Sequence, residues 1–410
     1  MLFIAVMKLL LVSPHFYPEN FKCNDWAFEL AKRGHEVTVL SDIPNYPQGI
    51  YYKGYNLFKR RKEKINGVTI YRAVVIPRGN ANAIRLGLNY ISFAICASFI
   101  ALYFALFKKF DAVLVHETSP ITVGLPALIV KKIQRIPMLF WVLDLWPESL
   151  TAAGGIKNKY VIGFFTKVTN LIYRNSNKIL ISSKGFSKSI LEKGDYQDKI
   201  VYYPNWADKA LSQKTDYQLP DLPNGFIAMF AGNIGEAQDF DHLLETAKYL
   251  KEEKNIHFVL VGDGRKRPWV EEYIKENHLK ETVHWVGRHP IESMPKFFAK
   301  ADVMLVSLKD NLVFNLTAPA KIQAYMSAGK PIAMMLNGEG PRILNEANCG
   351  FSVNAGDARN YANLIKRMSK LSKDELFSMG EQGKAYCDKF FNIDRSLDKI
   401  CFLLNSKINK

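Results

Sequence analysis

Short apolar runs rich in β-branched residues alternate with helical patterns along most of the 410 residues. This alternation is the signature of β-α-β units, whose strands build a parallel sheet covered by helices. A first series of strands is predicted at residues 9–13, 36–40, 69–75, 112–115, 137–142 and 179–182. After a proline-containing segment at residues 202–208, a second series is predicted at residues 227–230, 257–261, 283–286, 303–307 and 332–335. We therefore expect two successive doubly wound α/β domains.

Basic residues are concentrated in the first half of the chain. The formal net charge is +16, and residues 1–205 carry 27 Lys and Arg against 13 Asp and Glu, whereas residues 206–410 carry 28 against 26. Such a surplus indicates an anionic partner, which is nucleic acid, a membrane surface or a phosphorylated substrate. The five scattered cysteines lack the short spacings of metal or redox sites, so we expect free thiols in a cytoplasmic protein.

Two segments of the first half bear on membrane contact. Residues 86–107 contain no charged residue and are long enough to span a bilayer, but a predicted strand follows almost at once. Three interpretations of this segment therefore stay open: a full span, a buried crossover helix and a helix lying in the membrane interface. The polybasic run Lys59–Lys64 reads either as a solvated loop or as an attachment to anionic lipid, worth roughly 1 kcal/mol per basic residue.

Three glycine-containing loops follow predicted strands of the second half. Ligands of doubly wound sheets bind beyond the carboxyl ends of the strands. Glycines let backbone N–H groups approach phosphate oxygens, and a helix N-terminus adds partial positive charge. The loops together predict a site for a nucleoside diphosphate. Its candidate residues are Gly232, Asn233, Gly262, Gly264, Arg265, Lys266 and Arg288.

A fourth loop, at residues 315–326, leads into a helical pattern. Thr317 is predicted as the N-cap of a helix that begins near Pro319, since threonine caps well and proline is tolerated in the first turn. The exposed N–H groups around Ala318 and the charge of Lys321 suit a phosphate. The alternative is a capped amphipathic helix with no ligand.

Candidate catalytic groups in the first half also follow strands. Asp144 lies between two tryptophans at the end of a buried strand, which suits a sugar-binding or base position; the alternative is a turn cap. His116 ends the preceding strand, either in the same cleft or in a plain exit loop. Glu19 belongs to the first strand–helix loop, residues 13–20, whose two prolines, histidine and aromatic pair favour ligand binding.

The order of these motifs resembles a known family. FYPE, ELAKRGHEVTVLSD, DLWPES, PNWAD, FAGNIGEAQ, LVGDG, WVGRHP and PAKIQAYMSAGKPI occur in sequence over nearly the whole chain. The series resembles family-4 glycosyltransferases of the GT-B fold, especially the bacterial WbuB-like and colanic-acid-type subgroup that builds surface polysaccharide.

The resemblance implies a fold and a mechanism. Two Rossmann-like domains would face each other across a cleft, with acceptor binding and membrane contact on residues 1–204 and the nucleotide sugar on residues 205–390. Residues 391–410 would form a helix that returns to the first domain. The resemblance further implies transfer with retention of configuration and no required metal or cofactor. The donor phosphate would accept the proton while the protein neutralises the diphosphate.

The chain departs from the broader family at two places. Aligned on Gly329-Lys330-Pro331, the positions of two common glutamates hold Leu316 and Ala324. The usual Arg and Lys after the first glycine of the second domain are also missing, with Asn233 and Gln238 at or near their places. Arg265, Lys266, Arg288 and Lys321 remain as cations for the diphosphate, and Lys321 is the first choice. Glu339 is a candidate for a ribose or sugar hydroxyl.

These observations predict a membrane-associated glycosyltransferase on the cytoplasmic face. Its donor would be a UDP-sugar of the N-acetylated hexosamine or deoxyhexosamine type, such as N-acetylfucosamine, and its acceptor a polyprenyl-diphosphate-linked saccharide of O-antigen or capsule synthesis. The alternatives are a nucleotide-sugar 2-epimerase and a catalytically silent scaffold. Nucleic acid is not an expected partner, because no recognised binding module is present.

Overall fold

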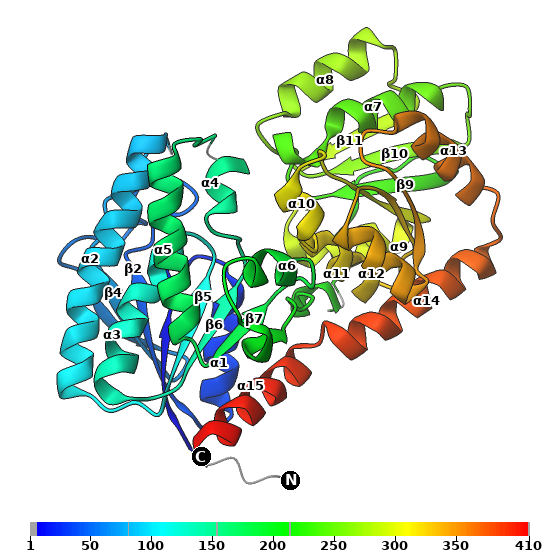
Figure 1. Ribbon diagram of the computed structural model, residues 1–410. Coiled ribbons are helices and arrows are strands. Elements are labelled where there is room, and N and C mark those ends of the chain that lie inside the picture. The colour runs from blue at the N-terminus through cyan, green and yellow to red at the C-terminus, as the bar shows by residue number, and fades with distance from the viewer. Residues whose placement is uncertain (1–5, 81, 153–154, 213–214, 409–410) are drawn as a thin grey trace. The chain divides into compact units, whose positions relative to one another are not determined.

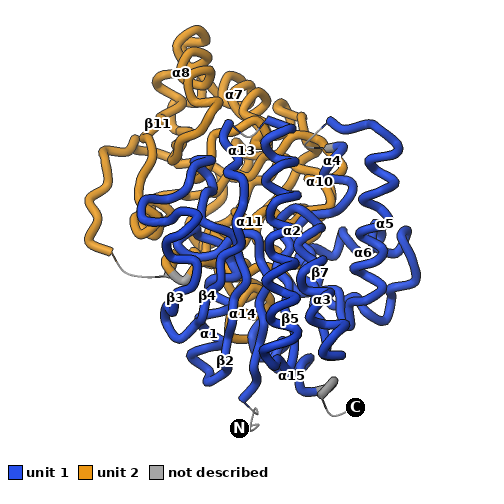
Figure 2. The backbone as a smooth tube through the Cα atoms, turned by 90° about the vertical axis from the view of Figure 1, so that its left-hand side faces the viewer, with its two compact units in different colours: residues 1–203, 396–410 blue, residues 204–395 orange. Residues whose placement is uncertain are grey.

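The computed structural model describes residues 6–80, 82–152, 155–212 and 215–408. Figures 1 and 2 show two compact units, which are residues 1–203 with 396–410 (unit 1) and residues 204–395 (unit 2). The division lies one residue before the predicted boundary at 204 and five residues beyond the predicted boundary at 390.

Unit 1 is built on an eight-stranded sheet in the order β3-β4-β2-β1-β5-β6-β7-β8. Its strands are β1 (Lys8–Val12), β2 (Glu36–Asp42), β3 (Lys62–Ile65), β4 (Val68–Ala73), β5 (Ala112–Glu117), β6 (Met138–Val142), β7 (Lys178–Ile181) and β8 (Ile200–Tyr202). Its helices are α1 (Lys22–Lys32), α2 (Ala83–Phe107), α3 (Gly124–Gln134), α4 (Glu148–Ala152), α5 (Lys159–Asn175), α6 (Phe186–Leu191) and most of α15 (Ile393–Ile408), with 3₁₀ turns η1 (Ile121–Val123) and η2 (Gln197–Lys199).

The strand order of unit 1 places its loops at one edge. All neighbouring strands pair in parallel except β3 and β4. The chain order reverses between β1 and β5, which makes the carboxyl ends of these two strands the topological switch point where ligands of such sheets bind. Strand β5 is buried along its whole length, as expected for a central parallel strand.

The polybasic run is partly a strand, so the prediction of a plain loop is wrong for residues 62–64. Lys62–Ile65 pairs antiparallel with β4 as the edge strand β3. Glu63 explains this pairing, because its carboxylate accepts from the fully buried Arg72 of β4 at 2.6 Å. The lysines of β3 alternate outward, which leaves an edge that is charged and resists pairing with other chains.

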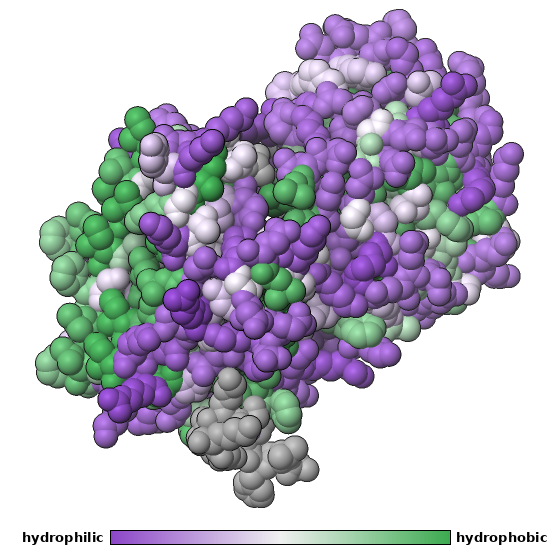
Figure 3. Space-filling model, in the orientation of Figure 1, coloured by the Kyte–Doolittle hydropathy of each residue, from purple (hydrophilic) through white to green (hydrophobic). Residues whose placement is uncertain are grey.

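Helix α2 connects β4 to β5 and packs on α3, β2 and β4. Side chains three or four positions apart form its buried stripe: Asn89, Phe93, Ala97, Ala101 and Phe104. The opposite face of α2, which we call the outer face, is exposed and apolar, and it consists of Ile84, Leu88, Ile91, Ile95, Phe99, Leu102, Tyr103, Leu106 and Phe107. Figure 3 shows hydrophobic residues gathered on this side of unit 1. Among the described residues, α2 is the one helix long and apolar enough to cross a membrane.

Unit 2 contains a six-stranded parallel sheet in the order β11-β10-β9-β12-β13-β14. Its strands are β9 (Phe226–Ala231), β10 (Ile256–Val261), β11 (Val283–Gly287), β12 (Val303–Ser307), β13 (Ile332–Met335) and β14 (Gly350–Val353). Its helices are α7 (Phe240–Tyr249), α8 (Arg267–Glu276), α9 (Met294–Lys300), α10 (Leu312–Leu316), α11 (Ala320–Ser327), α12 (Glu339–Ala347), α13 (Ala358–Met368) and α14 (Lys373–Phe390), with 3₁₀ turns η3 (Lys209–Ser212), η4 (Glu236–Gln238) and η5 (Ile291–Ser293).

The sheet of unit 2 is covered on both faces. Alternate residues of β9 enter two separate hydrophobic clusters, with Phe226 and Phe230 in one and Ile227 and Met229 in the other. Successive side chains of a strand point to opposite faces of the sheet, and here both faces are covered, so β9 is buried throughout. The continuous apolar runs of the sequence predict such strands. The strand order of both units confirms two doubly wound α/β domains.

Helix α15 carries the chain back to unit 1. Arg33 at the end of α1 donates to Asp398 at 2.6 Å, and Lys399 donates to the carbonyl of Tyr202 at 2.8 Å. Leu397, Ile400 and Leu404 are fully buried. The five cysteines are free, as predicted.

Candidate functional site

Three loops at the carboxyl ends of β9, β10 and β11 are fastened to one another by their backbones. The N–H of Gly232 donates to Val261, and the N–H of Gly262 donates to Gly287, at 2.9 and 2.7 Å. The N–H of Ile234 likewise donates to Asp263 at 2.9 Å. The predicted glycine-containing loops are therefore adjacent, because the parallel pairing of β11, β10 and β9 brings their ends to one edge of the sheet.

Two adjoining clefts open at this edge. The first has a volume of about 790 Å³ and is lined by Gly232, Asn233, Val261, Gly262, Asp263, Gly264, Arg265, Arg267, Pro268, Arg288, His289 and Met294. The second has a volume of about 680 Å³, shares Gly232, Arg288, His289 and Met294 with the first, and extends to Lys321. Each cleft is of the size that small ligands occupy. The predicted residues that line one cleft or both are Gly232, Asn233, Gly262, Gly264, Arg265, Arg288 and Lys321.

Lys321 is a half-buried cation. It lies in the first turn of α11, its Nζ donates to the amide oxygen of Gln238 at 2.5 Å, and it lies 4.5 Å from the centre of the Phe230 ring. Burial lowers the pKa of Lys321 to about 8. Among the described residues it forms no ion pair, so its charge is desolvated and uncompensated. An anion in the second cleft would supply the missing charge.

Other predicted donor-site residues have different surroundings. Lys266 pairs with Asp241 and lies over the Trp269 ring at 4.2 Å, and it lines neither cleft. The carboxylate of Glu339 receives two hydrogen bonds from Arg342 in the same helix, at 2.6 and 2.8 Å. Arg265 and Arg288 are exposed, and both line the first cleft.

The prediction that Thr317 caps a helix is wrong. Its hydroxyl donates backwards to the carbonyl of Val313 at 2.7 Å, at the end of α10, and the residue that precedes α11 is Pro319. The short helix α10 was not predicted. Its Val313 carbonyl accepts a hydrogen bond from the Thr317 hydroxyl, which the sequence pattern assigned to the start of α11. Ala318 is buried between the two helices.

Two further residues of this site were missed by sequence analysis. Arg267 lines the first cleft and lies over the Trp285 ring at 5.4 Å. His289 lines both clefts and is held by the hydroxyl of Tyr217 at 2.8 Å and by the carbonyl of Val286 at 2.8 Å. Gln238, which the sequence places near one of the missing basic residues, accepts the hydrogen bond of Lys321. Arg267 and His289 each stand one position beyond a predicted loop residue, so a wider window on each loop would have found them.

Gly262 offers a test of this loop arrangement. Its φ of +141° disfavours other residues, and a Cβ there would lie 1.9 Å from the carbonyl oxygen of Gly232. We expect Gly262→Ala to lower the free energy of unfolding by roughly 2–5 kcal/mol through overpacking and backbone strain. Denaturant titration measures the change. Gly87→Ala, in open space on α2, is the matched control and should slightly raise stability; equal effects of the two would contradict the argument.

The candidate catalytic residues of unit 1 lie at the carboxyl edge of its sheet. His116 is fully buried, its Nδ1 lies 3.1 Å from the Ser13 hydroxyl, and burial lowers its pKa to about 3. Asp144 accepts hydrogen bonds from the hydroxyls of Ser119 and Ser149, and burial raises its pKa. His116 is therefore neutral, and both oxygens of Asp144 are engaged within the protein.

Glu19 holds a loop in place. Its Oε1 accepts from the backbone N–H groups of Asn45 and Tyr46 at 2.7 and 2.6 Å, and its other oxygen faces His15 at 3.1 Å. Asp42, at the end of β2, lies 3.6 Å from the same imidazole. Sequence analysis missed Asp42, since it ends a different strand and no local pattern joins it to residues 15–19.

Comparison with known proteins covers both units. Residues 22–206 match the family described as glycosyl transferase 4-like domain, and residues 225–370 match the family described as glycosyl transferases group 1. A putative colanic acid biosynthesis glycosyl transferase, WcaI of Escherichia coli K12, is 24% identical over 79% of this chain and 82% of its own length. The α-monoglucosyldiacylglycerol synthase of Acholeplasma laidlawii is 21% identical over 66% of each chain.

Solved structures agree on the fold. The crystal structure of HepE from Anabaena in complex with UDP superposes with a TM-score of 0.71 at 14% identity, covering 98% of this chain and all of that one. The predicted GT-B architecture is confirmed. The two family matches fall on the two units in order, and the chain belongs to the family-4 glycosyltransferases of the GT-B fold.

Proposed function

We propose that the protein is a retaining glycosyltransferase that moves a sugar from a UDP-sugar to a polyprenyl-diphosphate-linked acceptor in surface polysaccharide synthesis. The observation that carries the donor half of this proposal is the pair of clefts in unit 2, with the uncompensated Lys321 at one of them. UDP in the HepE structure and the colanic acid role of WcaI support it. The sugar that we favour is an N-acetylated hexosamine or deoxyhexosamine, such as N-acetylfucosamine.

In this proposal, unit 2 stabilises the leaving diphosphate. Backbone N–H groups of the glycine-containing loops and the side chains of Lys321, Arg265 and Arg288 would meet the negative charge that develops as the glycosidic bond breaks. Preorganised donors in a partly desolvated site are worth more than in water, because they need no reorganisation during the reaction. The acceptor hydroxyl would lose its proton to the donor phosphate, and neither a metal nor another cofactor is required.

The acceptor half of the proposal rests on unit 1. Its basic surplus and the apolar outer face of α2 suit a peripheral or monotopic position on the inner face of the cell membrane, where a polyprenyl-linked acceptor is available. An interfacial helix buries one apolar face in lipid, and α2 offers such a face while its other face is packed on the sheet. The diacylglycerol-derived product named for the Acholeplasma relative is consistent with a lipid-linked acceptor.

A transfer assay tests the proposal. The protein is incubated with radiolabelled UDP-sugars and a polyprenyl-diphosphate-linked saccharide, and labelled lipid is separated by extraction. Transfer from at least one UDP-sugar is expected. UDP binding without transfer from any donor would favour the silent scaffold, and conversion of a UDP-sugar into its C2 epimer without acceptor would favour the epimerase.

Lys321 makes donor binding depend on pH. Since burial lowers its pKa to about 8 in the free protein, the charged form that binds the diphosphate is lost as the pH rises through 8. We expect UDP affinity, measured by calorimetry, to fall about tenfold between pH 7 and pH 9. Lys321→Arg should remove this dependence, because arginine stays charged. An identical pH profile in the wild type and the arginine variant would exclude Lys321 as the titrating group.

A further inference from the structure

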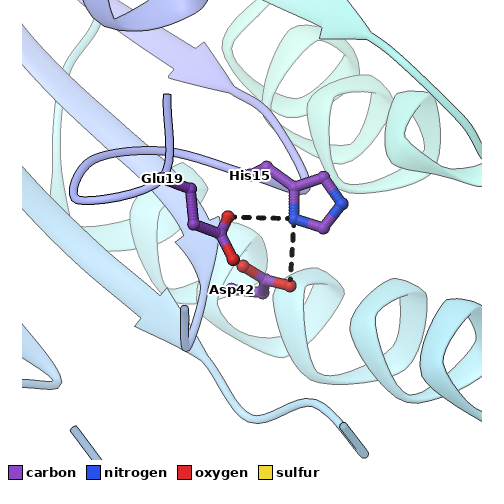
Figure 4. A group of neighbouring side chains, drawn as sticks. All are labelled: His15, Glu19 and Asp42. Atoms are coloured by element: carbon purple, nitrogen blue, oxygen red, sulfur yellow. Dashed lines mark ion pairs between the residues drawn. The ribbon is translucent and has the colours of Figure 1, made fainter. Parts of the chain in front are cut away.

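A buried group of charged side chains lies at the carboxyl edge of the unit 1 sheet. Figure 4 shows His15 with its Nδ1 directed at Glu19 and Asp42, 3.1 and 3.6 Å from the nearest oxygen of each. All three side chains are almost completely buried. His15 and Glu19 come from the loop after β1, and Asp42 ends β2. Neither the donor site nor the candidates Asp144 and His116 account for this histidine.

Arg78 approaches the other side of the imidazole. Its Nη2 lies 2.7 Å from His15 Nε2, and its guanidinium lies between the rings of Tyr46 and Tyr90, 5.2 and 5.6 Å from their centres. Arg78 forms no ion pair among the described residues, and its buried Nε has no hydrogen-bond partner there. The guanidinium is thus held in position by stacking and by the histidine, while most of its donors are unused.

Spacing alone would permit a metal ion, since Nδ1 and one oxygen of each carboxylate lie within 4.8 Å of one another. The contact with Arg78 argues against that. A metal on Nδ1 would place a divalent charge, in place of a single proton, close to the Arg78 guanidinium, which lies 2.7 Å from the other nitrogen of the same ring. The favoured occupant of Nδ1 is therefore a hydrogen, and the nearest oxygens of Glu19 and Asp42 lie 3.1 and 3.6 Å from this nitrogen. A metal ion does not fit this arrangement.

The charge of His15 follows from the same neighbours. Burial opposes its protonation, but the charges and hydrogen bonds of Asp42 and Glu19 outweigh burial and raise the pKa of His15 to about 9. In the imidazolium form, Nε2–H and the Arg78 N–H groups are all donors, facing each other at 2.7 Å. An oxygen acceptor placed beside them would satisfy both cations at once.

The loop that carries Arg78 is fastened to α2. Ser92 on α2 accepts from the backbone N–H of Ile76 at 2.9 Å, and Asn89 donates to the Ile76 carbonyl at 2.7 Å. Tyr90, which stacks on Arg78, belongs to the same helix. The paired cations therefore adjoin the beginning of the helix whose outer face is exposed and apolar. A ligand with a phosphate and a hydrocarbon chain matches both features.

We propose that Arg78 and His15 form a binding site for the phosphate group of an isoprenoid-linked substrate, with Glu19 and Asp42 orienting the histidine. This inference rests on the proposed function and names the residues of unit 1 that would hold the diphosphate of its acceptor. Bidentate geometry makes arginine suited to a phosphate. The tyrosines limit its motion, so less conformational entropy is lost on binding.

Calorimetric titration of the full chain with farnesyl diphosphate, in saturating UDP to occupy the donor site, tests the inference. We expect Arg78→Gln to weaken farnesyl diphosphate binding at least tenfold. Arg78→Lys, which keeps the charge without the fork, should give an intermediate loss. The matched control is Arg85→Gln, which removes one exposed charge near the start of α2 and should change the affinity less than twofold. UDP affinity and the thermal midpoint should be unchanged in all three variants.

Further probes separate the sources of phosphate. Equal affinity of the wild type and Arg78→Gln for farnesyl diphosphate would overturn the inference. The inference would also be overturned if Arg78→Gln lost binding to phosphatidylglycerol vesicles alone, because Arg78 would then bind bilayer headgroups. Tight Mn²⁺ binding that Glu19→Gln abolishes would overturn it as well. If inorganic pyrophosphate binds as tightly as farnesyl diphosphate, the isoprenoid part of the inference is overturned. Failure of UDP to bind the wild type contradicts the proposed function instead, and is measured separately.

Discussion

Replacement of Lys321 by methionine is expected to weaken UDP binding and at the same time to stabilise the fold. Loss of a charged hydrogen-bond donor costs about 1.5–3 kcal/mol of binding, which corresponds to a roughly 10- to 100-fold higher dissociation constant for UDP. Methionine has a similar length and needs no hydration. The opposite signs of the two effects distinguish a ligand-binding lysine from a structural one.

The stability effect follows from the depressed pKa of Lys321. Its pKa of about 8 in the folded state lies below the value near 10.4 of an unfolded chain, so the charged lysine destabilises the fold at pH 7 by about 3 kcal/mol. This penalty disappears as the pH rises from 8 towards 10.4. Lys321→Met should therefore raise the free energy of unfolding at pH 7 and approach the wild type at high pH.

Lys309→Gln is the control for the change of charge. Lys309 also lies in unit 2, is 43% exposed and pairs with Glu236. Its loss should alter UDP affinity less than twofold and should not raise stability. Calorimetry and denaturant titration measure both quantities. A Lys321→Met variant that is less stable than the wild type and binds UDP equally well would remove Lys321 from the donor site.

Polar replacement of the outer face of α2 is expected to release the protein from membranes. Ile91, Ile95 and Phe99 are 59%, 53% and 70% exposed. Full burial of such a side chain in lipid contributes about 1.5–3 kcal/mol, so Gln at all three positions should weaken partitioning into vesicles by roughly 100-fold or more. Vesicle sedimentation with phosphatidylglycerol-containing liposomes measures the change.

The fold should tolerate this triple variant, since the replaced side chains make few contacts inside unit 1. The control removes exposed apolar side chains from unit 2 through Tyr249→Gln and Phe377→Gln, at 53% and 67% exposure. That variant should sediment with vesicles as the wild type does. If the α2 variant still binds vesicles fully, the outer face serves another purpose, and Lys59–Lys64 becomes the next segment to neutralise.

The sequence predicted the elements that are buried on both sides and missed those at the margins. Strands such as β5, β9 and β12 are continuous apolar runs, because helices cover both faces of a parallel sheet. Strand β3 is Lys-Glu-Lys-Ile at an open edge, so its composition resembles a loop, and only its pairing with β4 makes it a strand. Propensity cannot identify such an edge, since its stability comes from a neighbour.

The two candidate sites differ in how far they could be predicted. Gly232 and Gly262 each follow a strand directly, so position along the chain was enough to place them near one another. Lys321 follows β12 only after the helix α10. His15 and Arg78 are 63 residues apart and meet only because the loops after β1 and β4 converge at one edge. Their pairing depends on strand order, which local patterns do not encode.

The return of the chain to unit 1 has a consequence for synthesis on the ribosome. Unit 2 is one continuous stretch, residues 204–395, and all of it emerges before residues 396–408 are made. Unit 1 needs this last segment, because the segment contributes the buried side chains of Leu397, Ile400 and Leu404. Its Asp398 also pairs with Arg33. The first half of the protein to be translated is therefore the last to complete its core. Until then, the apolar surface that α15 covers stays exposed, and chaperones can recognise such a surface.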